Sequence, residues 1–197
     1  MRFIPYVAAA AAAMLFVAAC LPVTSKVPVG TSVGFKVDPV LLGTWKATGP
    51  DGGEPAYIHI LGDDDGTMTA VLVTPPQKES LGDWSVYRLR VATLGANHIV
   101  NAQETIANSK PSEGPLAQMN VLLLYRTSGA GKIVLFQMDD KAAADAIRAG
   151  EIAGDIEPGD NGDVHITASE PALDAFMKGP RAAKLFSKVL VVLTKVP

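Results

Sequence analysis

From about residue 40 onward, short apolar stretches alternate with turns rich in glycine, proline, aspartate and asparagine. Stretches of this length between turn residues predict β-strands. Their connections are mostly too short for parallel crossovers, so the sheet should be mainly antiparallel. The expected strands are 41–47, 56–61, 67–74, 83–93, 98–104, 119–126, 132–138, 152–156, 164–168 and 189–196.

Helical spacing occurs only near the C-terminus. The segment 139–149 repeats alanine and isoleucine at helical intervals and is followed by Gly150, a residue typical of helix C-termini. A second helix is expected over 169–178, with Ser169 as its N-cap, and residues 180–188 should continue helically. Residues 105–116 are expected to form a polar loop.

These elements predict a mainly β protein with minor α content. Antiparallel sheets avoid exposed edges by closing into barrels or pairing into sandwiches, and both architectures remain open. Strands 132–138 and 189–193 are apolar on both faces. Because a wall facing water should alternate, we expect the two or three C-terminal helices, or a partner, to cover them.

The N-terminus carries an export pattern. Arg2 precedes an unbroken apolar run, Val7 to Ala19, that ends in small residues. The sequence Val17-Ala18-Ala19-Cys20 resembles the lipobox of bacterial lipoproteins. That resemblance implies cleavage between Ala19 and Cys20 and attachment of a diacylglycerol to the cysteine.

The lipobox has consequences for organisation and location. Residues 1–19 would be the signal peptide, 20–37 a lipid-anchored flexible tether rich in proline and glycine, and 38–197 a single β-rich periplasmic domain. Residue 21 is leucine rather than aspartate, which in lipoprotein sorting implies the outer membrane, facing the periplasm. Cys20 is the only cysteine, so the mature domain would have no disulfide.

Gly43-Thr44-Trp45 begins the first long strand. It resembles the Gly-x-Trp motif that opens lipocalins and related calycin barrels, some of which are outer-membrane lipoproteins. The resemblance implies a barrel that binds a small apolar ligand and is plugged at its closed end by Trp45. Lipocalins usually stack an arginine from the last strand on this tryptophan, whereas the last strand here offers Lys188 and Lys195.

Several aromatic residues are candidates for lining a ligand pocket, with a plain core or surface role as the alternative. They are Trp45, Trp84, Tyr87, Tyr125 and Phe136.

The sequence contains no recognisable catalytic constellation, so we predict neither an enzyme nor a bound cofactor. His59, His98 and His165 lie on strands without a second ligand at metal spacing, and we expect them to face solvent without a metal. The run Asp63-Asp64-Asp65-Gly66 is a turn. A looser acidic segment could bind Ca²⁺, although a loop without metal is the favoured interpretation. Its candidate ligands are Asp155, Glu157, Asp160 and Asp163.

A formal net charge of −3 argues against a nucleic-acid partner. Two functional hypotheses remain. The first is an outer-membrane lipoprotein, attached through the Cys20 lipid, whose barrel binds a small apolar ligand or lipid. The second is a cell-envelope structural or interaction lipoprotein that docks onto a larger protein assembly without a small-molecule ligand.

Overall fold

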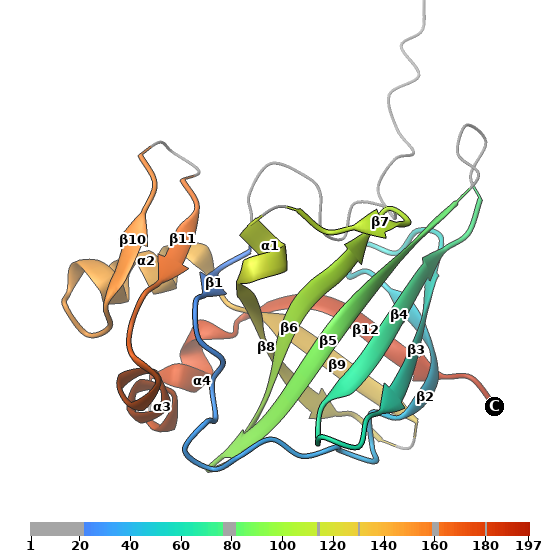
Figure 1. Cartoon of the computed structure of the whole chain (residues 1–197), viewed down its shortest axis with the longest axis horizontal. Coiled ribbons are helices and arrows are strands. Elements are labelled where there is room, and N and C mark those ends of the chain that lie inside the picture. The colour runs from blue at the N-terminus through green and yellow to red at the C-terminus, as the bar shows by residue number, and fades with distance from the viewer. Residues whose placement is uncertain (1–21, 77–81, 114, 130, 159–161, 180) are drawn as a thin grey trace, which may run out of the picture.

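The computed structural model describes residues 22–76, 82–113, 115–129, 131–158, 162–179 and 181–197. Eight antiparallel strands form a closed barrel (Figure 1). The ring closes where β12 pairs with β2 and where β6 pairs with β8. Its strands are β2 (Gly43–Thr48), β3 (Ala56–Gly62), β4 (Met68–Thr74), β5 (Asp83–Leu94), β6 (Asn97–Ala107), β8 (Asn120–Thr127), β9 (Lys132–Gln137) and β12 (Lys188–Lys195).

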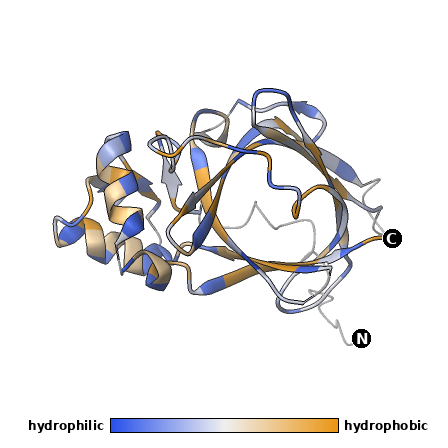
Figure 2. Cartoon of the chain, turned by 90° about the horizontal axis from the view of Figure 1, so that it is seen from below, coloured by the Kyte–Doolittle hydropathy of each residue, from blue (hydrophilic) through white to orange (hydrophobic). Residues whose placement is uncertain are grey.

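The chain between β9 and β12 forms a lobe beside the barrel, as the view along the barrel shows (Figure 2). The lobe contains α2 (Asp140–Arg148), β10 (Gly154–Ile156), β11 (Val164–Ile166), α3 (Glu170–Lys178) and α4 (Ala182–Leu185). The other elements are β1 (Thr24–Ser25), β7 (Lys110–Pro111) and α1 (Pro115–Gln118).

The prediction of a mainly β, antiparallel fold is confirmed, and the architecture is a barrel rather than a sandwich. The segment expected as a polar loop is more ordered than predicted, because β6 continues along β5 and then turns back into β7. Positive φ angles at Asn108 and Ser109 make that turn. In the described part of the segment expected to be helical after α3, residues 181–188, only the short α4 forms.

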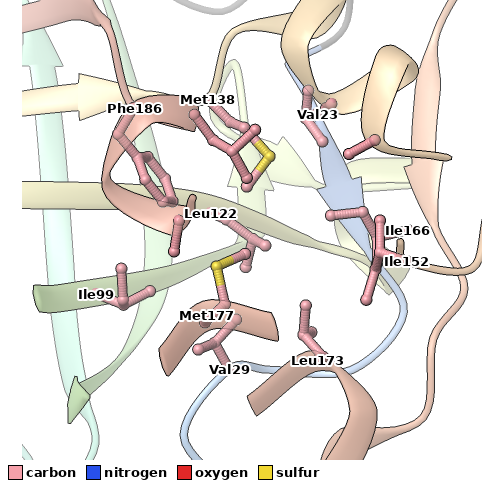
Figure 3. Packing of buried hydrophobic residues seen from close by; sticks show 14 of the residues in the cluster. Val23, Val29, Ile99, Leu122, Met138, Ile152, Ile166, Leu173, Met177 and Phe186 are labelled. Carbon is pink, nitrogen blue, oxygen red and sulfur yellow. The ribbon is translucent and has the colours of Figure 1, made fainter. Parts of the chain in front are cut away.

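Strand β8 separates two apolar cores. Its residues Leu122 and Leu124 point into the core between barrel and lobe, part of which Figure 3 displays. Residues Val121, Leu123 and Tyr125 belong instead to the core inside the barrel. Because side chains alternate along a strand, these two sets lie on opposite faces of β8. The lobe therefore covers the outer face of β8.

The expected cover over the doubly apolar strands is only partly present. Phe136 on β9 packs against the core of the lobe. Val189 on β12, the cross-strand partner of Phe136, nevertheless remains 37% exposed.

The segment expected to be a flexible tether is packed against the domain. We call residues 22–37 the N-terminal strap. Its strand β1 lies between β8 and β11, and its side chains Val23 and Val29 are buried in the core between barrel and lobe. The chain then runs down the side and across the lower end of the barrel to β2 (Figure 1). The difference arises because the valines of the strap bury apolar surface and thereby offset the cost of ordering it.

Two buried polar side chains hold the strap. The Asn101 amide accepts from Val29 N at 2.6 Å and donates to Val29 O at 2.9 Å. The Asp174 carboxylate on α3 accepts from the backbone N–H groups of Gly30 and Ser32, at 2.5 and 2.9 Å. At Gly30 the strap passes so close to β5 that a Cβ atom would lie 2.0 Å from that of Ala92.

The Asp174 contacts predict a pH-dependent contribution to stability. Burial raises the pKa of Asp174, but hydrogen bonds from Ser32 and Gly30 outweigh it, so the pKa lies below 3.8. A carboxyl whose folded-state pKa is depressed stabilises the fold above its unfolded pKa and loses that effect as the pH falls. We expect Asp174→Asn to lower the free energy of unfolding by about 1–3 kcal/mol at pH 7.

The measurement is urea unfolding of both proteins at pH 7 and in steps below pH 4. The difference between Asp174→Asn and the unsubstituted protein should shrink in the acid range, as Asp174 becomes protonated. Asp51→Asn, at an exposed turn, is the matched control and should change little. A difference that stays constant with pH would contradict the assigned role of the Asp174 charge.

Candidate ligand-binding site

The inward-facing side chains of the barrel strands enclose an apolar cavity of about 80 Å³. All of its lining residues are aliphatic except for a single tyrosine. They are Leu41, Ala47, Ile58, Ile60, Ala70, Leu72, Tyr87, Leu89, Val100, Ala102, Leu123, Leu135, Leu190, Val191 and Leu193. Such a lumen favours an apolar molecule over a polar one, because a polar group would enter it without hydrogen-bond partners.

Trp45 lies in the barrel core and is 2% exposed. Its indole N–H donates to Leu41 O at 2.7 Å. Lys195, its cross-strand partner on β12, places Nζ 4.4 Å from the centroid of the indole ring and donates to Leu42 O. This cation–π contact and the two hydrogen bonds join the first and last barrel strands to the chain that precedes β2.

Gly43 allows this close contact. Its φ angle is +103°, and a Cβ atom there would lie 2.6 Å from Lys195 Nζ. A side chain at position 43 would therefore be strained and would displace the lysine. The glycine and the tryptophan of the Gly43-Thr44-Trp45 motif thus serve the same contact with Lys195.

Tyr125 adds a second polar contact with the chain just before β2. Its side chain is buried, and its hydroxyl donates to the Asp38 carboxylate. Burial and the neighbouring Asp38 raise the pKa of the Tyr125 phenol, so it stays protonated as a donor. The exposed His98, the cross-strand partner of Tyr125 on β6, lies on the same face of the sheet, with its ring centroid 5.2 Å from that of Tyr125.

A polar group lies beside the cavity, next to β7. Tyr87 lines the cavity, and its hydroxyl donates to Glu104 Oε1 at 3.2 Å. Ser112, which follows β7, donates to Glu104 Oε2 at 2.7 Å. Burial raises the pKa of the Tyr87 phenol, and the Glu104 carboxylate raises it further. The cavity is therefore apolar, and the Glu104 carboxylate, which is not among its lining residues, is connected to it through the Tyr87 hydroxyl.

The aromatic residues predicted to line a pocket lie in four different places. Tyr87 lines the cavity, whereas Trp45 and Tyr125 belong to the core around it. Trp84 is 40% exposed on the outside of β5. Phe136 faces the lobe and lies under the Arg126 guanidinium, 5.4 Å from the ring centroid.

Glu104 and Ser112 were not predicted from the sequence. A usable signal was present for Glu104, because it shares the alternation of Val100 and Ala102, both of which face the lumen. Ser112 reaches the site only through the turn into β7, which the pattern of the sequence does not reveal.

His59 and His98 are exposed, as predicted, and each ring pairs with a threonine hydroxyl. The aspartate run forms the predicted turn, in which Asp63 and Asp65 accept from Thr67. His165 differs from the prediction of a solvent-facing histidine, since its side chain is only 15% exposed beneath β1. Asp160 lies outside the described residues.

Among the described residues, no helix is both long and apolar enough to cross a membrane. Comparison with known proteins gives no match among family models, curated proteins or solved structures.

Proposed function

We propose that this chain is a bacterial outer-membrane lipoprotein, attached through Cys20, whose barrel binds a small apolar or amphipathic molecule in the periplasm. The observation that carries the ligand proposal is the lumen itself. Its walls are aliphatic except for Tyr87, whose hydroxyl connects the cavity to the Glu104 carboxylate. That arrangement suits an alkyl chain whose head group donates a hydrogen bond to Glu104.

The lipocalin-like character of the barrel belongs to the same proposal. Lys195 occupies the position over Trp45 where lipocalins usually place an arginine, and it forms the cation–π contact from the last strand. The supporting features are thus the Gly43-Thr44-Trp45 motif, the closed antiparallel barrel and this contact.

Size limits the class of ligand. A cavity of about 80 Å³ is smaller than the roughly 300–1,000 Å³ of typical small-molecule sites. Dry apolar cavities of about 150 Å³ are known to hold a benzene-sized molecule. We therefore expect a slender, flexible ligand, and we expect the aliphatic lining to move outward when it binds.

The test is native mass spectrometry of the chain from Leu21 onward, exported to the periplasm and purified without detergent. We expect a reproducible added mass that is lost on denaturation. Ala70→Leu places a larger side chain in the cavity and should reduce the occupied fraction at least tenfold. Ala96→Leu, in an exposed turn, is the matched control and should leave occupancy unchanged.

Equal occupancy in Ala70→Leu and Ala96→Leu would contradict binding in the lumen. Glu104→Gln keeps the shape of the side chain and removes its charge. If it releases a basic ligand but retains a neutral one, the result assigns the head group. A clean ligand-free mass for the unsubstituted protein would reject the ligand-binding function.

That last outcome would favour the docking function, which has one supporting observation. Tyr57, Val73 and Trp84 are direct cross-strand neighbours on β3, β4 and β5 and are 42%, 45% and 40% exposed. They form a short apolar row on the outer wall of the barrel. Crosslinking from Trp84 in intact cells would then identify an envelope protein.

A further inference from the structure

The hairpin of β10 and β11 brings together three potential metal ligands from the lobe, away from the lumen. Its register pairs Ile156 with Val164, and the Glu157 N–H donates to Asp163 O at 2.9 Å. Glu157, Asp163 and His165 each offer one ligand atom, and these atoms all lie within 4.8 Å of one another. The distance from His165 Nε2 to Glu157 Oε1 is 3.7 Å.

The imidazole of His165 contacts the strap through its Nδ1 atom. Its Nδ1 lies 2.7 Å from Thr24 Oγ1, on a residue of β1 that is completely buried. The Thr24 hydroxyl donates its only hydrogen to Met119 Sδ, at 3.1 Å. With its hydrogen directed at Met119, Thr24 Oγ1 can accept from His165 Nδ1–H, and in that tautomer His165 Nε2 carries a lone pair.

The Nε2 lone pair faces the same space as the two carboxylates. Three electron-rich groups converge there, and a divalent cation between them would satisfy all three. A histidine that binds metal through one nitrogen characteristically donates from its other nitrogen to a fixed acceptor, and the buried Thr24 hydroxyl offers His165 such an acceptor. Glu157 has a side chain 60% exposed, so it is free to close the remaining distance.

We propose that Glu157, Asp163 and His165 form a binding site for a divalent transition metal, with Zn²⁺ as the best match. One imidazole nitrogen and two carboxylate oxygens are ordinary zinc ligands, and water would complete the tetrahedron. Imidazole disfavours Ca²⁺ and Mg²⁺, which take oxygen ligands. This site departs from the Ca²⁺ loop considered from the sequence, because the fold adds a histidine to the acidic residues.

The location suggests what the metal does. His165 touches the strap through Thr24, whereas Glu157 and Asp163 belong to the turn end of the hairpin. Bound metal would fix the hairpin and the imidazole that holds β1, so occupancy should stabilise docking of the strap onto the lobe. This role is independent of ligand binding in the barrel.

The experiment is isothermal titration of Zn²⁺ into the full chain in detergent micelles, after chelator treatment and without added histidines. We expect one saturable site, and visible absorption bands when Co²⁺ replaces Zn²⁺. His165→Gln and Glu157→Gln should each weaken Zn²⁺ binding at least tenfold. Thr24→Val should weaken it about tenfold through loss of the orienting contact, and Thr24→Ser should restore it.

His59→Gln is the matched control, because His59 also pairs with a threonine hydroxyl, at 2.8 Å, and lies outside the metal-ligand group. It should leave Zn²⁺ affinity unchanged. Glu157→Gln changes an exposed side chain and should fold normally, so it remains informative if His165→Gln does not fold. No saturable binding up to 1 mM Zn²⁺, or equal affinity in Glu157→Gln and the unsubstituted protein, would overturn the proposal.

Discussion

Replacing Cys20 by serine is expected to move the protein almost completely from the membrane fraction to the soluble fraction or to leave an unprocessed precursor. The thiolate is the nucleophile to which the lipid would be attached, and serine cannot replace it in that reaction. Each buried methylene contributes about 0.8 kcal/mol to membrane binding, so two or more acyl chains give a stable anchor and their loss abolishes it. Membrane fractionation and metabolic labelling with a radioactive fatty acid measure both effects.

Leu21→Asp is the matched control for this experiment. It changes the neighbouring residue and leaves the cysteine in place, so labelling and membrane attachment should persist. By the lipoprotein sorting rule, the protein should then shift from the outer to the inner membrane. If Cys20→Ser fractionates like the unsubstituted protein, the anchor proposal is wrong, whatever the barrel binds.

The packed strap changes what such an anchor would do. A flexible tether of 20–37 would have let the domain move away from the membrane. The described chain is instead buried from Val23, so Cys20 would be only a few residues from the folded domain. Three extended residues span at most about 10 Å. An anchored barrel would therefore stay against the membrane surface and have little freedom to rotate.

The strap was misjudged because its local pattern resembles a linker. It contains prolines, glycines and few charges, and it has no helical period. Its apolar side chains were the contrary signal, because Val23, Val27 and Val29 all pack against the core of barrel and lobe. The surface against which they pack is formed by β8, β11 and α3, which come about 100 or more residues later in the chain. Contacts over such separations leave no periodicity in the strap itself.

The strands of the barrel were largely predictable, because alternating apolar residues and turn residues are local signals. Its closure was not, since pairing of β12 with β2 depends on the whole circuit of strands. For the candidate site, assigning side chains to the two faces of each strand by strict alternation would have improved the prediction of the lining residues. Trp84 and Tyr87 lie three positions apart, an odd offset, and therefore face opposite sides of β5. The metal ligands required knowledge of the hairpin register and of the strap behind His165.

Trp45→Ala is expected to lower the free energy of unfolding by about 3–5 kcal/mol, the usual cost of removing a large buried aromatic side chain. The substitution would leave a cavity in the barrel core and would remove the indole hydrogen bond to Leu41 O. It would also remove the ring beneath the Lys195 ammonium group. Because domains of this kind are stable by only about 5–15 kcal/mol, urea unfolding should show a much lower midpoint.

Trp84→Ala provides the matched control, since the chain has two tryptophans and Trp84 is 40% exposed. Its effect should stay within about 1 kcal/mol. Lys195→Met should cost about 1 kcal/mol, through the cation–π contact and the hydrogen bond to Leu42 O. Lys195→Arg should retain most of that stability, because guanidinium can make both contacts. Equal losses in Trp45→Ala and Trp84→Ala would mean that Trp45 does not join the ends of the barrel sheet. Loss confined to Trp45→Ala and Lys195→Met would mean that the contact between Trp45 and Lys195 stabilises the pairing of the first and last barrel strands.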